Sequence, residues 1–286
     1  MRFVAWERDG IHGLAVSRGS AFVELKNLDL MTILRAGPAG LAQARTLSET
    51  APVLELNGLQ YLPPLSAPAK IVCVGMNYQD HAAENNLKAQ THPTFFLRVA
   101  SSLIGHQQPL IRPSVSEQLD YEGELAAIIG KPGRHIPLDR ALEHVAGYAV
   151  FNEASIRDYQ LSRGQQWTLG KNFDGTGAFG PYFVTADELP PGARGLRLET
   201  RLNGVTVQST NTDQMIFDVA TLITKLSEAM TLEVGDVIVT GTPAGIGLFR
   251  EPKLWMKAGD VCEVEIERVG TLRNPVSDET LTHRFN

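Results

Sequence analysis

Three acidic side chains alternate along the stretch DYEGELAAI, which begins at Asp120 and turns apolar after Glu124. In an extended strand, alternate side chains point to the same face, so Asp120, Glu122 and Glu124 would crowd together. Like charges side by side destabilise a strand, and a buried carboxylate needs a partner. The stretch is therefore either a solvent-exposed acidic face or part of a site for a divalent cation, which prefers oxygen ligands.

The apolar continuation LAAIIG favours the cation site, because Glu122 and Glu124 adjoin residues of a buried type. Asp120 lies at the start of the strand, where a ligand, a residue behind the ligands and a rim residue all remain open. Glu153 ends a second apolar run, AGYAVFNE, and is a further acidic candidate. Its alternative is a surface glutamate at the start of a helix, where the helix dipole favours an acid.

Four other side chains could act on a substrate. His81 and Glu84 share a face if NYQDHAAE is helical, and a carboxylate can orient a histidine that acts as a general base. Lys171 lies among glycines in LGKNFDGTG and could stabilise a negative oxygen, and Thr242 in TGTPAGIG could hold an anionic group. The ordinary alternatives are a surface pair, an exposed loop lysine and a tight turn.

The composition excludes several classes of protein. The chain has 286 residues, is 43% hydrophobic and carries a formal net charge of −6, which argues against a nucleic-acid-binding surface. No stretch approaches the roughly 18 consecutive apolar residues of a membrane helix. We see no signal-peptide pattern and expect a cytoplasmic protein. Cys73 and Cys262 lie in apolar runs, so we expect buried, reduced thiols.

Strand signals outnumber helix signals along the chain. We expect a small N-terminal domain over residues 1–65 and a larger catalytic domain over residues 66–286. Asn203-Gly204 predicts a hairpin turn between two strands, and apolar spacing predicts a helix over residues 215–230. Regular strand–helix alternation is absent, so the pattern favours a β-rich α+β fold, a sandwich or roll, over a doubly wound sheet.

Six stretches, taken in chain order, resemble the fumarylacetoacetate hydrolase family over about residues 68–276. They are CVGMNYQDHAAE, DYEGELAAIIG, GYAVFNEASIRDYQ, GKNFDGTGAFGP, LNGVTVQ and GDVIVTGTPAGIG. The resemblance implies a mixed β-sandwich roll with a small N-terminal domain, usually as a homodimer. It implies a Mg²⁺ or Mn²⁺ ion held by Glu122, Glu124 and Glu153. The family usually has an aspartate at the position of Glu153, whose longer side chain moves the carboxylate outward.

The resemblance also implies the remaining roles. His81 and Glu84 match a pair that activates water, Gln160 and Lys171 match substrate-binding positions, and Thr242 matches the threonine of a TGTP turn. The implied reaction is hydrolysis of a C–C bond in an acylpyruvate-type or related 1,3-dioxo acid, in aromatic or sugar-acid degradation. It releases pyruvate or a similar 2-oxo acid. The alternatives are decarboxylation or isomerisation of an oxaloacetate-like or 2-hydroxy-dienoate diacid, and a family member that only binds a diacid.

His81→Ala tests the water-activating role. We expect this variant to lose hydrolysis, because no group takes the proton from water, and to keep oxalate binding, because the carboxylates still hold the cation. Pyruvate release from an acylpyruvate and calorimetric titration with oxalate in Mn²⁺ measure the two properties. Loss of the metal in His81→Ala would contradict the role.

Overall fold

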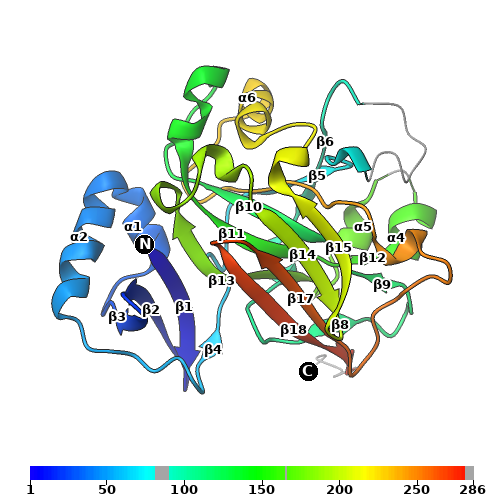
Figure 1. Ribbon diagram of the computed structural model, residues 1–286, viewed down its shortest axis with the longest axis horizontal. Coiled ribbons are helices and arrows are strands. Elements are labelled where there is room, and N and C mark those ends of the chain that lie inside the picture. Colours follow the sequence, from blue (N-terminus) through cyan, green and yellow to red (C-terminus); the bar gives the residue numbers. More distant parts are fainter. Residues whose placement is uncertain (81–89, 165, 281–286) are drawn as a thin grey trace, which may run out of the picture.

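A computed structural model describes residues 1–80, 90–164 and 166–280. Two β-sheets dominate this part of the chain and pack face to face, with helices around them (Figure 1). The fold is α+β and rich in strands, as the sequence predicts. No helix among the described residues is long and apolar enough to cross a membrane.

The large sheet contains eleven strands in the described part of the chain. They are β1 (Arg2–Arg8), β2 (Ile11–Arg18), β3 (Ala21–Glu24), β4 (Gln60–Tyr61), β5 (Ile71–Gly75), β6 (Thr94–Arg98), β7 (Leu103–Ile104), β10 (Gly123–Ile129), β11 (Val145–Glu153), β13 (Gly177–Thr185) and β16 (Val237–Val239). The main order is β3-β2-β1-β13-β11-β10-β16-β5-β6, with β4 added at β1 and β7 added at β13.

The second sheet lies in front of the large one in Figure 1. Its strands are β8 (Leu110–Arg112), β14 (Arg197–Leu202), β15 (Val205–Asn211), β17 (Val261–Ile266) and β18 (Gly270–Asp278), in the order β15-β14-β17-β18-β8. Asn203 and Gly204 connect β14 to β15 with φ values of 53° and 78°, so the predicted hairpin turn is confirmed. Two short strands, β9 (Leu119–Asp120) and β12 (Ser155–Ile156), pair separately.

Helices and short turns pack around these sheets, and the first two helices share a core with the N-terminal strands of the large sheet. The α-helices are α1 (Leu30–Arg35), α2 (Gly37–Thr50), α4 (Arg157–Ser162), α5 (Thr168–Lys171) and α6 (Val219–Ala229), and short 3-10 turns include η2 (Leu138–His144) and η6 (Gly247–Phe249). The helix predicted over residues 215–230 begins later than expected, because the side chain of Asp218 caps it at the backbone N–H of Thr221.

Strand β10 is buried on both faces, which explains its uninterrupted apolar sequence. Leu125 and Ala127 face the core shared with the second sheet, whereas Ala126 and Ile128 face the core shared with β1, β2 and α1. The N-terminal strands extend the same large sheet, since β1 pairs with β13 from Arg2 opposite Val184. The division of the chain near residue 65 stays a prediction.

Ile128→Ala tests the packing of this double-sided strand. Ile128 is fully buried in β10, whereas Ile11 in β2 is 66% exposed, so Ile11→Ala is a matched control. We expect Ile128→Ala to lower the free energy of unfolding by about 2–5 kcal/mol. The change in Ile11→Ala should stay within about 0.5 kcal/mol. Urea unfolding followed by circular dichroism measures both, and equal losses would contradict the packing described here.

Candidate active site

Three carboxylates meet where β10 begins and β11 ends. The two strands are antiparallel, with Gly123 opposite Asn152, and the backbone N–H of Glu153 donates to the carbonyl of Glu122 at 2.9 Å. Glu122, Glu124 and Glu153 are all buried, and each offers one oxygen within 4.8 Å of the other two. The structure therefore brings together the three residues that the sequence singles out as metal ligands.

Asp120 is buried beside this triad but is not one of its three converging carboxylates. The acidic strand expected from residue 120 is interrupted at Tyr121 and Glu122, because β9 pairs with β12 while β10 pairs with β11. The Asp120 carboxylate instead accepts hydrogen bonds from the backbone N–H groups of Gly247 and Leu248, at 2.7 and 3.0 Å. Of the three places left open for Asp120, the structure favours the one behind the candidate ligands, because Arg157 pairs with both Asp120 and Glu122.

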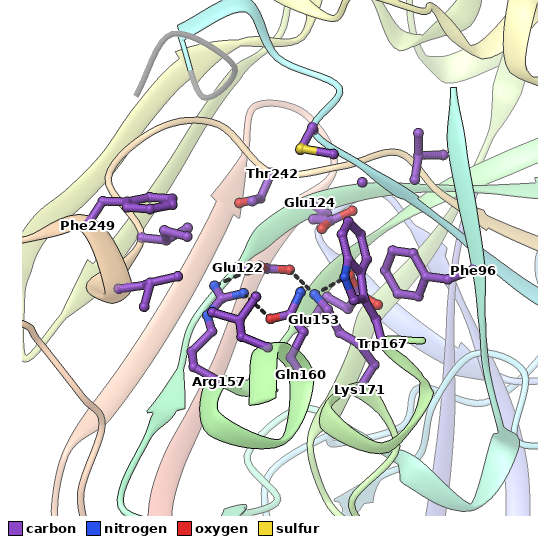
Figure 2. Close-up of a pocket in the computed structure, with 16 residues that line it drawn as sticks. Phe96, Glu122, Glu124, Glu153, Arg157, Gln160, Trp167, Lys171, Thr242 and Phe249 are labelled. Atoms are coloured by element: carbon purple, nitrogen blue, oxygen red, sulfur yellow. Dashed lines mark hydrogen bonds and ion pairs between the residues drawn. The ribbon is translucent and has the colours of Figure 1, made fainter. Parts of the chain in front are cut away.

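Lys171, the last residue of α5, lies between two carboxylates of the triad. Its Nζ is 2.6 Å from Oε2 of Glu122 and 3.1 Å from Oε2 of Glu153, and the side chain is buried (Figure 2). Burial by itself lowers the pKa of Lys171, but the carboxylates of Glu122 and Glu153 outweigh it and hold the pKa above its ordinary value. Lys171 is therefore a buried cation rather than an exposed loop lysine.

Two buried arginines complete the charge pattern. Nη2 of Arg157 lies 2.7 Å from Oε1 of Glu122, and Nη1 of Arg98 lies 3.6 Å from Oε1 of Glu153. With Asp120, which pairs with Arg157, four buried carboxylates thus face three buried cations. One negative charge is left over if all these groups are ionised.

That excess charge is concentrated near Glu124. The Glu124 carboxylate accepts a hydrogen bond from the backbone N–H of Gly241, and within the described residues Glu124 forms no ion pair. Burial raises the pKa of the Glu124 carboxyl well above its ordinary value, and the carboxylates of Glu153 and Glu122 raise it further.

The triad fits a divalent cation. Oε1 of Glu153 is buried and accepts no hydrogen bond from any described residue. All three candidate ligands are carboxylates, a set that suits Mg²⁺, Mn²⁺ or Ca²⁺. A cation bound among them would offset the excess negative charge and give a close partner to an oxygen whose described ion-pair partner, Nη1 of Arg98, is 3.6 Å away.

A cavity of about 270 Å³ opens onto the triad. Gln160 in α4 lines it, and its Oε1 accepts from Nη1 of Arg157 at 2.8 Å, which turns the amide NH₂ group the other way (Figure 2). Thr242 also lines the cavity, but its hydroxyl donates to the carbonyl of Gly123 and accepts from Nε2 of Gln208. The hydroxyl of Thr242 is thus engaged within the protein.

Apolar side chains form the rest of the cavity wall. Trp167 packs edge-on against Phe96, with ring centroids 5.3 Å apart. A Cβ on Gly75 would lie 2.4 Å from the ring of Trp167, so only glycine lets that ring approach. Leu161, Ile246, Leu248 and Phe249 line the cavity as well.

Several of these residues are difficult to find from sequence. Arg157 could as well have paired with its neighbour Asp158, yet Asp158 instead accepts from Ser116, and Arg157 points inward. Arg98 follows two phenylalanines and a leucine in a strand, where nothing marks it as buried. His81 and Glu84, the expected water-activating pair, lie outside the described residues.

Comparisons with known proteins agree with this geometry. Residues 70–277 match the family "Fumarylacetoacetate (FAA) hydrolase C-terminal". The chain is 41% identical over 272 residues to human "Oxaloacetate tautomerase FAHD2A, mitochondrial", covering 92% of this chain and 86% of that protein.

Two solved structures show the same fold. A fumarylacetoacetate hydrolase from Exiguobacterium antarcticum is 36% identical, with a TM-score of 0.86 over 98% of this chain and 100% of that one. Maleylpyruvate hydrolase from Sphingobium sp. SYK-6, in complex with manganese(II) and pyruvate, is 25% identical, with a TM-score of 0.83 and the same coverage.

Glu124→Gln tests the charge excess through stability. The folded metal-free protein keeps the Glu124 proton to a higher pH than the unfolded chain. Protonated Glu124 therefore contributes fully to the stability of the folded protein below its ordinary pKa of 4.5. This contribution is lost as pH rises through the raised pKa. Glutamine has a similar shape and does not titrate, so we expect Glu124→Gln to raise the melting temperature of metal-free protein at pH 8 but not at pH 4.

The same variant reports on the metal. Mn²⁺ at about 100 times its dissociation constant stabilises a folded protein by about 2.7 kcal/mol. We expect the wild type to gain melting temperature on adding Mn²⁺ at pH 8 and Glu124→Gln to gain much less. Calorimetric scans with and without Mn²⁺ measure this, and an equal gain in both proteins would contradict a ligand role for Glu124.

Proposed function

Since the chain belongs to the fumarylacetoacetate hydrolase family, we propose that it is a divalent-metal-dependent enzyme that interconverts the enol and keto forms of an oxaloacetate-like 2-oxo diacid. The observation that carries this proposal is the buried triad of carboxylates with Lys171 between two of them. The choice of reaction rests on the oxaloacetate tautomerases among its relatives, which are about 40% identical over more than nine tenths of this chain.

Glu122, Glu124 and Glu153 would hold Mg²⁺ or Mn²⁺, and the ion would supply positive charge beside the oxygens of a 2-oxo acid, where the charge of an enolate develops. An ion there would also compete with Lys171 for Glu122 and Glu153. We assign to Lys171 the donation of a hydrogen bond to the negative oxygen of the enolate, because its Nζ lies against two carboxylate oxygens in the cavity.

The other site residues position the substrate. The NH₂ group of Gln160, directed away from Arg157, donates to a substrate oxygen. Thr242 contributes only to the cavity wall, because its hydroxyl donates its proton to the carbonyl of Gly123. In this proposal His81 moves the proton between the carbon and the oxygen of the substrate. Glu84, three positions further along the chain, assists it, as the family resemblance implies.

Hydrolysis of a C–C bond is the second candidate. It is favoured by the likeness to a maleylpyruvate hydrolase that binds manganese(II) and pyruvate, and by the His81–Glu84 pair, which suits activation of water. Both reactions pass through a similar enolate charge, and they differ in whether a water molecule is held beside the second carbonyl. Decarboxylation of oxaloacetate uses the same charge stabilisation without that water.

We also propose that the protein is a homodimer. Leu97, Val99 and Leu169 are about half exposed. Asn172 connects them, because its side chain bonds to the backbone of Leu97 and Val99 and its backbone N–H donates to the carbonyl of Leu169. An apolar surface of this kind at the edge strand β6 suits a second copy of the chain. Light scattering coupled to size-exclusion chromatography measures the mass, and a monomer at micromolar concentration contradicts this proposal.

Lys171→Met tests the oxyanion-stabilising role. Removing one such donor typically costs about 10²- to 10³-fold in kcat, so we expect a loss of that size at saturating Mn²⁺. Lys225→Met is the matched control, because Lys225 is a surface lysine paired with Glu228. The decay of the enol absorbance of oxaloacetate measures the rate. An unchanged kcat in Lys171→Met would contradict the role.

A substrate panel decides between the reactions. Mn²⁺-dependent loss of the enol signal without pyruvate release supports the tautomerase. Pyruvate release from an acylpyruvate with water consumed supports the hydrolase, and pyruvate release from oxaloacetate supports the decarboxylase. Tight oxalate binding with no turnover of any of these would identify a protein that only binds a diacid.

A further inference from the structure

Asp120 is fully buried just outside the cavity, and each oxygen of its carboxylate accepts two hydrogen bonds. Its Oδ1 accepts from the backbone N–H groups of Tyr121 and Gly247, at 2.9 and 2.7 Å. Its Oδ2 accepts from the backbone N–H of Leu248 at 3.0 Å and from Nε of Arg157 at 2.7 Å. Four donors thus fix the position of one side chain that does not itself reach the cavity.

Arg157 connects Asp120 to the cavity, because its two other nitrogens contact residues that line it. Nη2 lies 2.7 Å from Oε1 of Glu122, and Nη1 donates to Oε1 of Gln160 at 2.8 Å (Figure 2). Arg157 is itself only 2% exposed, so these contacts are not weakened by water. The planar guanidinium contacts all three partners at once, Asp120 and Gln160 by hydrogen bonds and Glu122 by an ion pair, which a lysine could not do.

The backbone contacts of Asp120 reach a second wall of the cavity. Gly247 and Leu248 belong to η6 and donate to Asp120. Leu248 and Phe249 line the cavity, and Phe249 lies opposite Lys171 and Trp167 in Figure 2. The space around Asp120 is tight, since a Cβ on Gly247 would lie 2.7 Å from its Oδ1. Asp120 is therefore tied to a candidate metal ligand, to a candidate substrate-binding amide and to the apolar wall.

We propose that Asp120 is a positioning residue that orients Glu122 and Gln160 through Arg157 and anchors the η6 wall of the pocket through its backbone bonds. This inference rests on the proposed function, because it assigns Glu122 to the metal and Gln160 to the substrate. Partners of metal ligands of this kind typically change metal affinity or activity by about 10–100-fold when they are removed.

Among side chains of this size, only a carboxylate presents acceptor oxygens to all four of these donors. In an asparagine, an NH₂ group replaces one of the two oxygens. The two donors at that position, either the pair at Oδ1 or the pair at Oδ2, would then face another donor and lose their hydrogen bonds. Asparagine would also remove one of the four carboxylate charges, so the cluster would lose its excess negative charge and attract a cation less strongly. Both effects act in the same direction, toward weaker metal binding.

The test compares Asp120→Asn with Asp236→Asn. Asp236 is an equally buried aspartate that pairs with Lys70 at 2.8 Å and accepts from the backbone N–H of Glu233, away from the cavity. We expect the dissociation constant of Mn²⁺, measured by calorimetric titration, to rise about 10-fold or more in Asp120→Asn. At saturating Mn²⁺ its kcat/KM for enol oxaloacetate should also fall, while Asp236→Asn matches the wild type in both even if its melting temperature drops.

Arg157→Lys keeps the test decisive if Asp120→Asn does not fold. This variant retains the charge and the backbone bonds of Asp120 but cannot reach Asp120, Glu122 and Gln160 together. We expect its Mn²⁺ dissociation constant to rise about 10-fold or more and its KM to rise with the loss of orientation at Gln160. Mn²⁺ affinity and kinetics equal to the wild type in Asp120→Asn, or in Arg157→Lys where Asp120→Asn is not obtained, overturn the proposal.

The two readouts separate this inference from the proposed function. A wild-type protein that binds Mn²⁺ but does not act on oxaloacetate overturns only the proposed reaction, and the Mn²⁺ affinities still decide on Asp120. A wild-type protein that binds no Mn²⁺ overturns both.

Discussion

The structure depends on keeping four carboxylates close together in a buried place. Arg98, Arg157 and Lys171 enter from β6, α4 and α5 and compensate three of the charges, which leaves the cluster one negative charge in excess. A buried charge without a partner either takes up a proton or binds a cation. A divalent ion would turn the excess into a single positive charge, which suits the carboxylate of a 2-oxo acid.

The fold positions this cluster with the ends of its elements. Because β10 and β11 are antiparallel, the start of one lies beside the end of the other, so Glu122 and Glu153 become neighbours although 31 positions separate them along the chain. The turn after β16 supplies the N–H of Gly241 to Glu124. Strands that are buried on both faces hold these ends rigidly, and the loops and short helices beyond them carry the residues that face the cavity.

Local patterns predict part of this arrangement. Two apolar runs, one beginning and one ending at glutamates, indicate the triad, and Asn203-Gly204 indicates the hairpin. Both can be predicted because each signal is contained within a few consecutive residues. The separation of Asp120 from the triad, the inward orientation of Arg157 and the burial of Arg98 depend on pairing between distant segments, which such patterns do not contain. The reaction is harder still, since hydrolysis, decarboxylation and tautomerisation use the same charge stabilisation. Hydrolysis adds a positioned water molecule, and the other two differ in whether CO₂ or a proton leaves the carbon.

The anomalous difference density of a crystal grown with Mn²⁺ tests directly whether the triad binds a cation. We expect one peak within about 2.0–2.6 Å of carboxylate oxygens from Glu122, Glu124 and Glu153. We also expect Nζ of Lys171 to give up at least one of its two carboxylate contacts. A crystal at saturating Mn²⁺ with no peak at the triad, and with Lys171 still held between Glu122 and Glu153, would contradict a metal-binding role for the triad.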